Sequence, residues 1–218
     1  MTSATPAERT RRRRLSPAER ERQIVDGAIA YFAEVGLTGQ TRELAQRLGI
    51  TQPLIYRYFP TKQDLIERVF EEVFVGRWKA EWSRLVVDRT LPLRERLIGF
   101  YRDYVADAFT YEWIRIYMFA GLAGEDLNRR YIAILEDMLL RPLCLELRHA
   151  AGVDIPDTDA VDSRELEGAW HIHAAVFYYV VRKHIYAAPV DPDLDEFIAD
   201  AVDRTLGGTL EQLRVRFG

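Results

Sequence analysis

The chain contains a single cysteine, Cys144, among its 218 residues. One thiol cannot form a disulfide within the chain, so a small disulfide-stapled scaffold is excluded and a reducing compartment is favoured. No apolar run approaches the roughly 20 residues that a membrane-spanning helix needs, and the N-terminus lacks an apolar signal region. We therefore expect a soluble, cytoplasmic protein without a membrane partner.

Motifs that would indicate an enzyme are also missing. The sequence has no phosphate loop, nucleotide-binding fingerprint, nucleophile elbow or paired metal-ligand motif. His171 and His173 are two positions apart, so on a helix their side chains diverge by roughly 200° and cannot bind one metal ion together. The sequence predicts no catalytic residue, no metal site and no cofactor.

Hydrophobic residues make up 48% of the chain, which is enough to bury a sizeable core. No segment shows sustained apolar and polar alternation bounded by turn signals, so we predict no strands. The run VFYYVV at residues 176–181 could imitate a strand, but it lies inside a longer helical pattern. The expected fold class is all-α with about nine helices.

Charge is divided unevenly along the chain. Residues 1–62 hold 11 Lys and Arg against 6 Asp and Glu, whereas residues 63–218 hold 19 against 28. The net charge of −4 therefore hides a basic head on an acidic body. Such asymmetry suits a protein that places one end on nucleic acid; chance clustering is the competing interpretation.

Residues 1–15 are polar and include Arg11, Arg12, Arg13 and Arg14. Like-charged segments of this kind are usually disordered in isolation. Two interpretations are open. The segment is either a flexible arm that neutralises DNA phosphates or enters the minor groove, or a solvated tail.

A first helix and then two short helices are predicted next. Ser16-Pro17-Ala18-Glu19 has the form of a capping box, and Gly36 ends the first helix. Thr41 is expected to cap a second helix that runs to Leu48, with the turn at Gly49. Thr51 is expected to cap the third. The two helices on either side of Gly49 have the sequence form of a helix-turn-helix motif. In such a motif the latter helix, here the one after Thr51, enters the major groove of DNA.

A longer helix is predicted from Lys62 to about Val87, capped by Thr61 with Asp64 in the capping-box position. A Lys at a positively polarised helix start is unfavourable unless a phosphate approaches it. Further helices are expected from Pro92, over the aromatic stretch 111–120, over 127–150 with a kink or break at Pro142, over 164–187 and over 193–217.

Residues Gln23 to Phe70 resemble the TetR/AcrR family of bacterial transcriptional repressors, the head being most similar to the tetracycline repressor type. The resemblance rests on AYFAEVGL, TRELAQRLG and ITQPLIYRYFPTKQDL. It implies a basic arm (1–15), a helix-turn-helix DNA-binding domain (16–62) and a ligand-binding and dimerisation domain (63–218). The implied function is transcriptional repression by a homodimer that binds a palindromic double-stranded DNA operator and is released by a small-molecule effector.

The resemblance also implies roles for single residues. Arg42 and Gln52 would read guanine and adenine edges, and Pro53 and Leu54 would meet a thymine methyl group. Arg57 could contact a base or a phosphate, and Tyr58 could instead pack in the core. The remaining phosphate contacts would come from Thr41, Thr51, Tyr56, Tyr58 and Lys62.

In the body, the resemblance implies a dimer interface built from the last two helices and an effector that shifts the long fourth helix. Gly207 and Gly208 lie inside a predicted helix, where Gly costs about 1 kcal/mol relative to Ala; close approach of another helix, or a kink, would explain them. Aromatic side chains with polar tips are candidate pocket residues, with core or interface packing as the alternative: Tyr101, Tyr104, Trp113, Tyr117, Trp170, His173 and Phe177.

Two other classes of protein remain as alternatives. An all-α enzyme with a helix-turn-helix-like head is disfavoured because catalytic motifs are missing. An architectural DNA binder without an effector is disfavoured by the aromatic-rich body.

Overall fold

The computed structural model describes residues 15–124, 126–153 and 160–217, and these contain helices but no strands, which confirms the all-α prediction. Two π-helical segments, η1 (Glu71–Val75) and η2 (Glu136–Leu140), continue neighbouring helices. The α-helices are α1 (Pro17–Val35), α2 (Thr41–Leu48), α3 (Gln52–Tyr58), α4 (Lys62–Phe70), α5 (Ala80–Val87), α6 (Leu93–Asp107), α7 (Tyr111–Ala123), α8 (Leu127–Leu135), α9 (Arg141–Ala151), α10 (Ser163–His184) and α11 (Leu194–Phe217).

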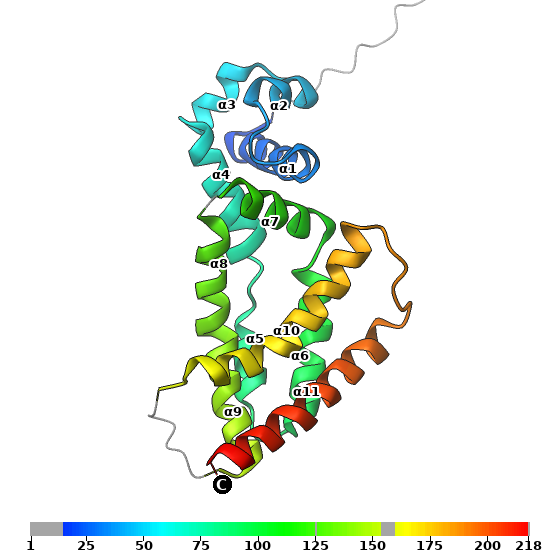
Figure 1. The fold of residues 1–218 in the computed structure, drawn as a ribbon. Helices are drawn as coiled ribbons and strands as arrows, with labels where there is room; N and C mark the ends of the chain where they lie inside the picture. Colours follow the sequence, from blue (N-terminus) through cyan, green and yellow to red (C-terminus); the bar gives the residue numbers. More distant parts are fainter. Residues whose placement is uncertain (1–14, 125, 154–159, 218) are drawn as a thin grey trace, which may run out of the picture.

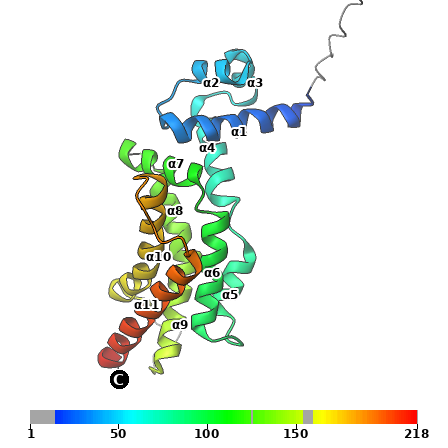
Figure 2. The same ribbon diagram turned by 90° about the vertical axis from the view of Figure 1, so that its right-hand side faces the viewer.

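The helices form a small head on a longer body. Figure 1 shows α1, α2 and α3 at one end of the molecule, with the C-terminus at the opposite end. Helix α4 leads from the head into the body, and α7 lies directly beneath α1 in both views (Figures 1 and 2). No helix within the described ranges has both the length and the apolar character that crossing a bilayer would require.

Local capping determines where the helices of the head begin. The predicted boxes Ser16–Glu19 and Thr61–Asp64 are both present. Gly49 has a φ of 63°, the left-handed conformation that a helix C-terminus favours. The prediction for Thr41 was wrong, because Gln40 is the N-cap and Thr41 is a buried residue of the first turn. Thr51 is the N-cap of α3, but its side chain forms no capping hydrogen bond.

The continuous helix predicted from Lys62 to Val87 is divided. The helix passes into the π-helical turn η1 and ends at Gly76, and α5 begins only at Ala80. A Cβ atom at Gly76 would lie 3.0 Å from the carbonyl oxygen of Glu71, so the turn leaves little room for a side chain. At the break predicted near Pro142, the structure has the π-helical segment η2. This segment changes the backbone hydrogen-bond pattern just before Pro142, which has no N–H to donate.

Buried ion pairs connect the helices of the body. Arg148 and Glu165 join α9 to α10 at 2.6 Å, and each side chain is only 3% exposed. Glu146 is bound by Arg96 at 2.8 Å and by Arg89 at 2.9 Å. Burial alone would raise the pKa of Glu146, but the hydrogen bonds from the two arginines bring it below its usual value. Each of these buried charges therefore has a partner of opposite sign. A buried charge without such a partner would strongly destabilise the fold.

Side chains of α7 and α8 hold α1 and α4 against the body. Arg115 of α7 donates hydrogen bonds to the carbonyl oxygens of Ala33 and Glu34 at the C-terminal end of α1, where the helix dipole favours a cation. Arg130 of α8 forms an ion pair with Glu67 at 2.7 Å. The guanidinium of Arg130 also lies over the Phe70 ring, 4.3 Å from its centroid. These contacts constrain the orientation of α1 and α4 on the body.

Candidate nucleic-acid interface and ligand cavity

Helix α3 carries the polar surface of the head. Ile55 is its one fully buried residue and anchors the helix in the core. Pro53, Tyr56 and Arg57 are exposed. Gln52, Leu54 and Tyr58 are partly buried at the edges of the same helix. The side of α3 away from the core therefore presents hydrogen-bonding groups and a little apolar surface to solvent.

Two hydrogen bonds join three of the predicted contact residues. The Gln52 Nε2 donates to Thr41 Oγ1 at 2.9 Å, and Thr41 Oγ1 also lies 2.9 Å from the Tyr56 hydroxyl. Because Thr41 is only 5% exposed, its hydroxyl is held inside the head between α2 and α3. The network orients the Gln52 amide and the Tyr56 ring, so it fixes the face that α3 presents.

The other predicted DNA contacts lie around this face. Arg42 is exposed on the first turn of α2, and Thr51 is exposed at the start of α3. Lys62 is half-buried in the first turn of α4, which the Thr61–Asp64 capping box closes. The starts of α2, α3 and α4 therefore each carry at least one predicted DNA-contacting side chain.

A groove lies between the start of α1 and helix α3. It has a volume of about 380 Å³ and is lined by Leu15, Pro17, Arg20, Leu54, Arg57 and Tyr58. Arg20 is a candidate that the sequence patterns missed, because capping signals locate the ends of a helix but do not show which of its side chains face α3. Arg11 to Arg14 lie outside the described residues. The first described residue after them, Leu15, lines this groove beside α3.

A model of the family described as "Bacterial regulatory proteins, tetR family" matches residues 24–69, which run from α1 to α4. The chain is 31% identical over 88 residues to the tetracycline repressor protein class A from transposon 1721 of Escherichia coli, covering 37% of this chain and 40% of that protein. The head of the chain therefore carries a TetR-type segment.

Other transcriptional regulators resemble part of the chain in sequence and most of it in fold. The regulator BetI of Burkholderia cenocepacia (strain HI2424) is 34% identical over 79 residues, covering 36% of this chain and 40% of BetI. The sequence matches thus span about two fifths of these relatives. A solved transcriptional regulator from Pseudomonas aeruginosa PAO1 has a TM-score of 0.65 at 18% identity, covering 96% of this chain and 99% of that one, so the fold extends through the body.

The body contains a cavity of about 160 Å³ walled by α7, α8 and α10. Five of the seven predicted pocket residues line it, and Tyr101 and Tyr104 are fully buried behind His173 instead. Tyr131 was missed, because its place in the wall depends on how α8 packs against α7 and α10. The lining consists of Trp113, Tyr117, Tyr131, Ile132, Leu135, Trp170, His173, Ala174 and Phe177.

His173 is the most unusual residue of the cavity wall. It is 4% exposed and has aromatic rings on several sides, including Trp170 at 5.5 Å and Phe109 at 5.8 Å between centroids. Burial lowers the pKa of its imidazole to about 3. Among the described residues, neither its Nδ1 nor the indole Nε1 of Trp113 has a hydrogen-bond partner. Unpaired buried polar groups are costly, so the wall contains unused hydrogen-bonding capacity.

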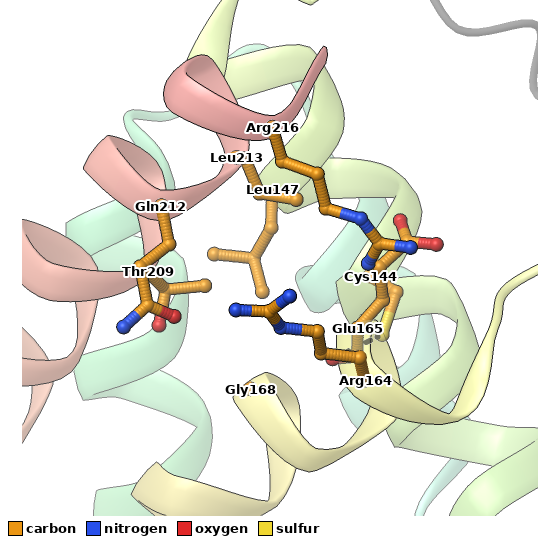
Figure 3. Close-up of a pocket in the computed structure, with 9 residues that line it drawn as sticks. All are labelled: Cys144, Leu147, Arg164, Glu165, Gly168, Thr209, Gln212, Leu213 and Arg216. Carbon is orange, nitrogen blue, oxygen red and sulfur yellow. Dashed lines mark hydrogen bonds between the residues drawn. The ribbon is translucent and has the colours of Figure 1, made fainter.

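A second cavity, of about 40 Å³, lies between α9, α10 and α11 near the C-terminal end (Figure 3). The Arg164 side chain crosses the space between α10 and α11, and the thiol of Cys144 donates to the carbonyl oxygen of Glu165 at 3.4 Å. Burial raises the pKa of Cys144 to about 12, so the thiol is unreactive. This space is too small for an organic ligand, and the carboxylate of Glu165 is already paired with Arg148.

The cavity wall is also in contact with the helix that leads to the head. Phe74 of η1 lies 5.2 Å from Trp113 and 5.4 Å from Tyr131 between ring centroids. It also lies 5.3 Å from Phe70 at the end of α4. The rings that line the cavity therefore pack on the same residue that supports α4.

The burial of His173 predicts a pH dependence of stability. Below the usual imidazole pKa of 6.5 the unfolded chain takes up a proton at this position, whereas the folded chain stays neutral to about pH 3. The free energy of unfolding should therefore fall by about 1.4 kcal/mol from this group between pH 7.5 and pH 5.5. Urea unfolding of wild type and His173→Phe at both pH values measures the difference, which the variant should lose. His171→Gln, a change on the exposed side of α10, should keep it; equal pH dependence in all three proteins would contradict the assignment.

Proposed function

We propose that the chain is a transcriptional regulator of the TetR type that binds a palindromic DNA operator as a homodimer and is released from it by a small molecule. The observation that carries the proposal is the hydrogen-bond network of Thr41, Gln52 and Tyr56, which holds a polar face of α3 in place within the segment that matches the TetR family. We assign residues 16–62 to DNA binding and residues 63–218 to ligand binding and dimerisation.

The contacts follow from the placement of each side chain. Gln52 at the first position of α3 would read a base edge, most favourably adenine, and Arg42 would read guanine. Arg57 and Arg20 flank the groove from which the arm of residues 11–14 would follow the DNA backbone. Phosphates would be bound by Thr51, Tyr56, Tyr58 and Lys62, and apolar contacts with thymine would come from Pro53 and Leu54.

Helices α10 and α11 support the proposed dimer. Gly207 and Gly208 are helical and exposed, and no atom of the described chain would meet a Cβ placed on either. An open groove of about 300 Å³ runs between the two helices beside Gly208. Two exposed glycines weaken a helix without benefit to a single chain, whereas a second copy could approach closely over them.

The cavity supports a ligand response and disfavours a purely architectural role. Its wall contacts Phe74, and Phe74 contacts Phe70 of α4. A ligand that displaces the wall would thus move the helix that supports the head. Half-sites of a palindrome must lie at matched positions of the groove, so a modest change in the spacing of two heads would abolish binding.

The proposal predicts different effects of two substitutions in the head. Gln52→Ala should relax specificity at one base position, with a loss of discrimination of about 1–3 kcal/mol. Lys62→Ala should weaken binding to all sequences and reduce the dependence of affinity on salt by about one counterion. Gln46→Ala, an exposed glutamine of α2, is the matched control.

The measurement begins with in vitro selection of DNA sites by the wild-type protein, followed by binding titrations of each variant at several salt concentrations. A selected palindrome with half-sites about one helical turn apart is expected. If both variants bound the selected site like the wild type, the assignment of α3 as the reading helix would be rejected.

The dimer interface predicts opposite effects of Gly208→Leu on the helix and on assembly. Leucine should favour the helix by about 1 kcal/mol, but its side chain would clash with a partner helix. We expect the variant to keep its helical content and to dissociate at protein concentrations at least tenfold higher than the wild type. Sedimentation equilibrium checks this, with Ala106→Leu on α6 as the control for an added exposed leucine. A dimer of unchanged affinity would place the interface elsewhere.

A further inference from the structure

Within the described part of the chain, the wall of the cavity of α7, α8 and α10 has no formal charge. None of the described residues that line it is Asp, Glu, Lys or Arg. The titratable side chains in its wall are His173, Tyr117 and Tyr131, and burial favours the neutral form of each. An ionised ligand would leave water without gaining a counter-charge, which is unfavourable in an apolar site.

Aromatic rings set the shape of the site. Trp113 and Tyr117 stack with their planes only 10° apart at a centroid separation of 4.9 Å, and Phe177 meets both edge-on. A further ring can pack against such walls in the offset or edge-to-face geometry that aromatic groups prefer. A cavity of about 150 Å³ is large enough to hold benzene, so the 160 Å³ of this cavity accommodates a single ring with small substituents.

The wall also supplies hydrogen-bonding capacity that the protein leaves unused. His173 is buried and its Nδ1 has no partner among the described residues. The hydroxyls of Tyr104 and Tyr131 bond to each other, so the one that accepts still has a hydrogen to donate. A neutral imidazole has one donor and one acceptor nitrogen, and a hydroxyl on the ligand can satisfy either.

We propose that this cavity, as the effector site of the regulator proposed above, takes an uncharged single-ring ligand whose hydroxyl group hydrogen-bonds to His173. Phenols are the simplest members of this class. Ring packing supplies most of the affinity, and the imidazole selects a hydroxyl over a methyl group at the same position.

Three probes of similar shape test the ligand class by isothermal titration calorimetry at pH 7. They are p-cresol, p-xylene, in which a methyl group replaces the hydroxyl, and p-toluate, which carries a negative charge. One neutral hydrogen bond corresponds to roughly a tenfold difference in affinity. We expect p-cresol to bind saturably and about tenfold more tightly than p-xylene, and p-toluate not to bind. Equal binding of p-cresol and p-xylene, or tighter binding of p-toluate, would overturn the proposal.

Variants test the assigned contact. His173→Phe keeps an aromatic ring and should bring the ratio of p-xylene to p-cresol dissociation constants from about ten to about one. Tyr101→Phe removes a buried hydroxyl that also lacks a partner but does not line the cavity, and should keep the wild-type ratio. A preference for p-cresol that persists in His173→Phe would remove His173 from the site; circular dichroism of both variants verifies that they fold.

Operator binding, measured in the same protein preparation, separates this inference from the proposed function. If the protein binds a selected palindrome but p-cresol fails to bind, the ligand class is wrong and the regulator remains. If p-cresol binds as expected but no DNA site can be selected, the proposed function is wrong and the ligand class is upheld.

Discussion

The packing of Phe74 against the rings of α7 and α8 is the interaction on which the rest of the structure depends. Trp113 and Tyr131 form part of the cavity wall and touch Phe74, which in turn stacks on Phe70 at the end of α4. The π-helical turn η1 holds Phe74 at this position. Close-packed protein interiors have low compressibility and transmit strain. One aromatic cluster therefore serves both the cavity and the attachment of the head.

The head and the body differ in charge. The body carries an excess of acidic residues, and buried charges such as Arg148 and Glu165 are paired. None of the described residues that line the cavity is Asp, Glu, Lys or Arg. The head has a basic surplus, with Arg42 and Arg57 exposed around α3. Arg115 connects the two parts by donating to the last carbonyl groups of α1. The family model matches residues 24–69, whereas fold similarity covers the body as well.

Local chemistry made much of the head predictable. The boxes Ser16–Glu19 and Thr61–Asp64 are decided within four residues, so sequence patterns locate them. Thr41 was misassigned because its hydroxyl is engaged by Gln52 and Tyr56, which are 11 and 15 residues away in the chain. The end of the fourth helix was misplaced because a π-helical turn depends on tertiary packing and has no simple periodic signal. Most of the cavity residues were recognisable as aromatics with polar tips, but which of them face the cavity depends on how α7, α8 and α10 pack.

The central claim is that the cavity wall and the head share one packed unit through Phe74. Native-state hydrogen exchange of the wild type and of Phe74→Leu tests it without any ligand. The account predicts that the substitution speeds amide exchange in α4 and α7, which pack on Phe74, and in α1, which α7 holds through Arg115. If exchange accelerated in α7 and α8 while the amides of α1 and α4 kept their wild-type rates, the head would be attached independently of the cavity wall, and the account would be contradicted.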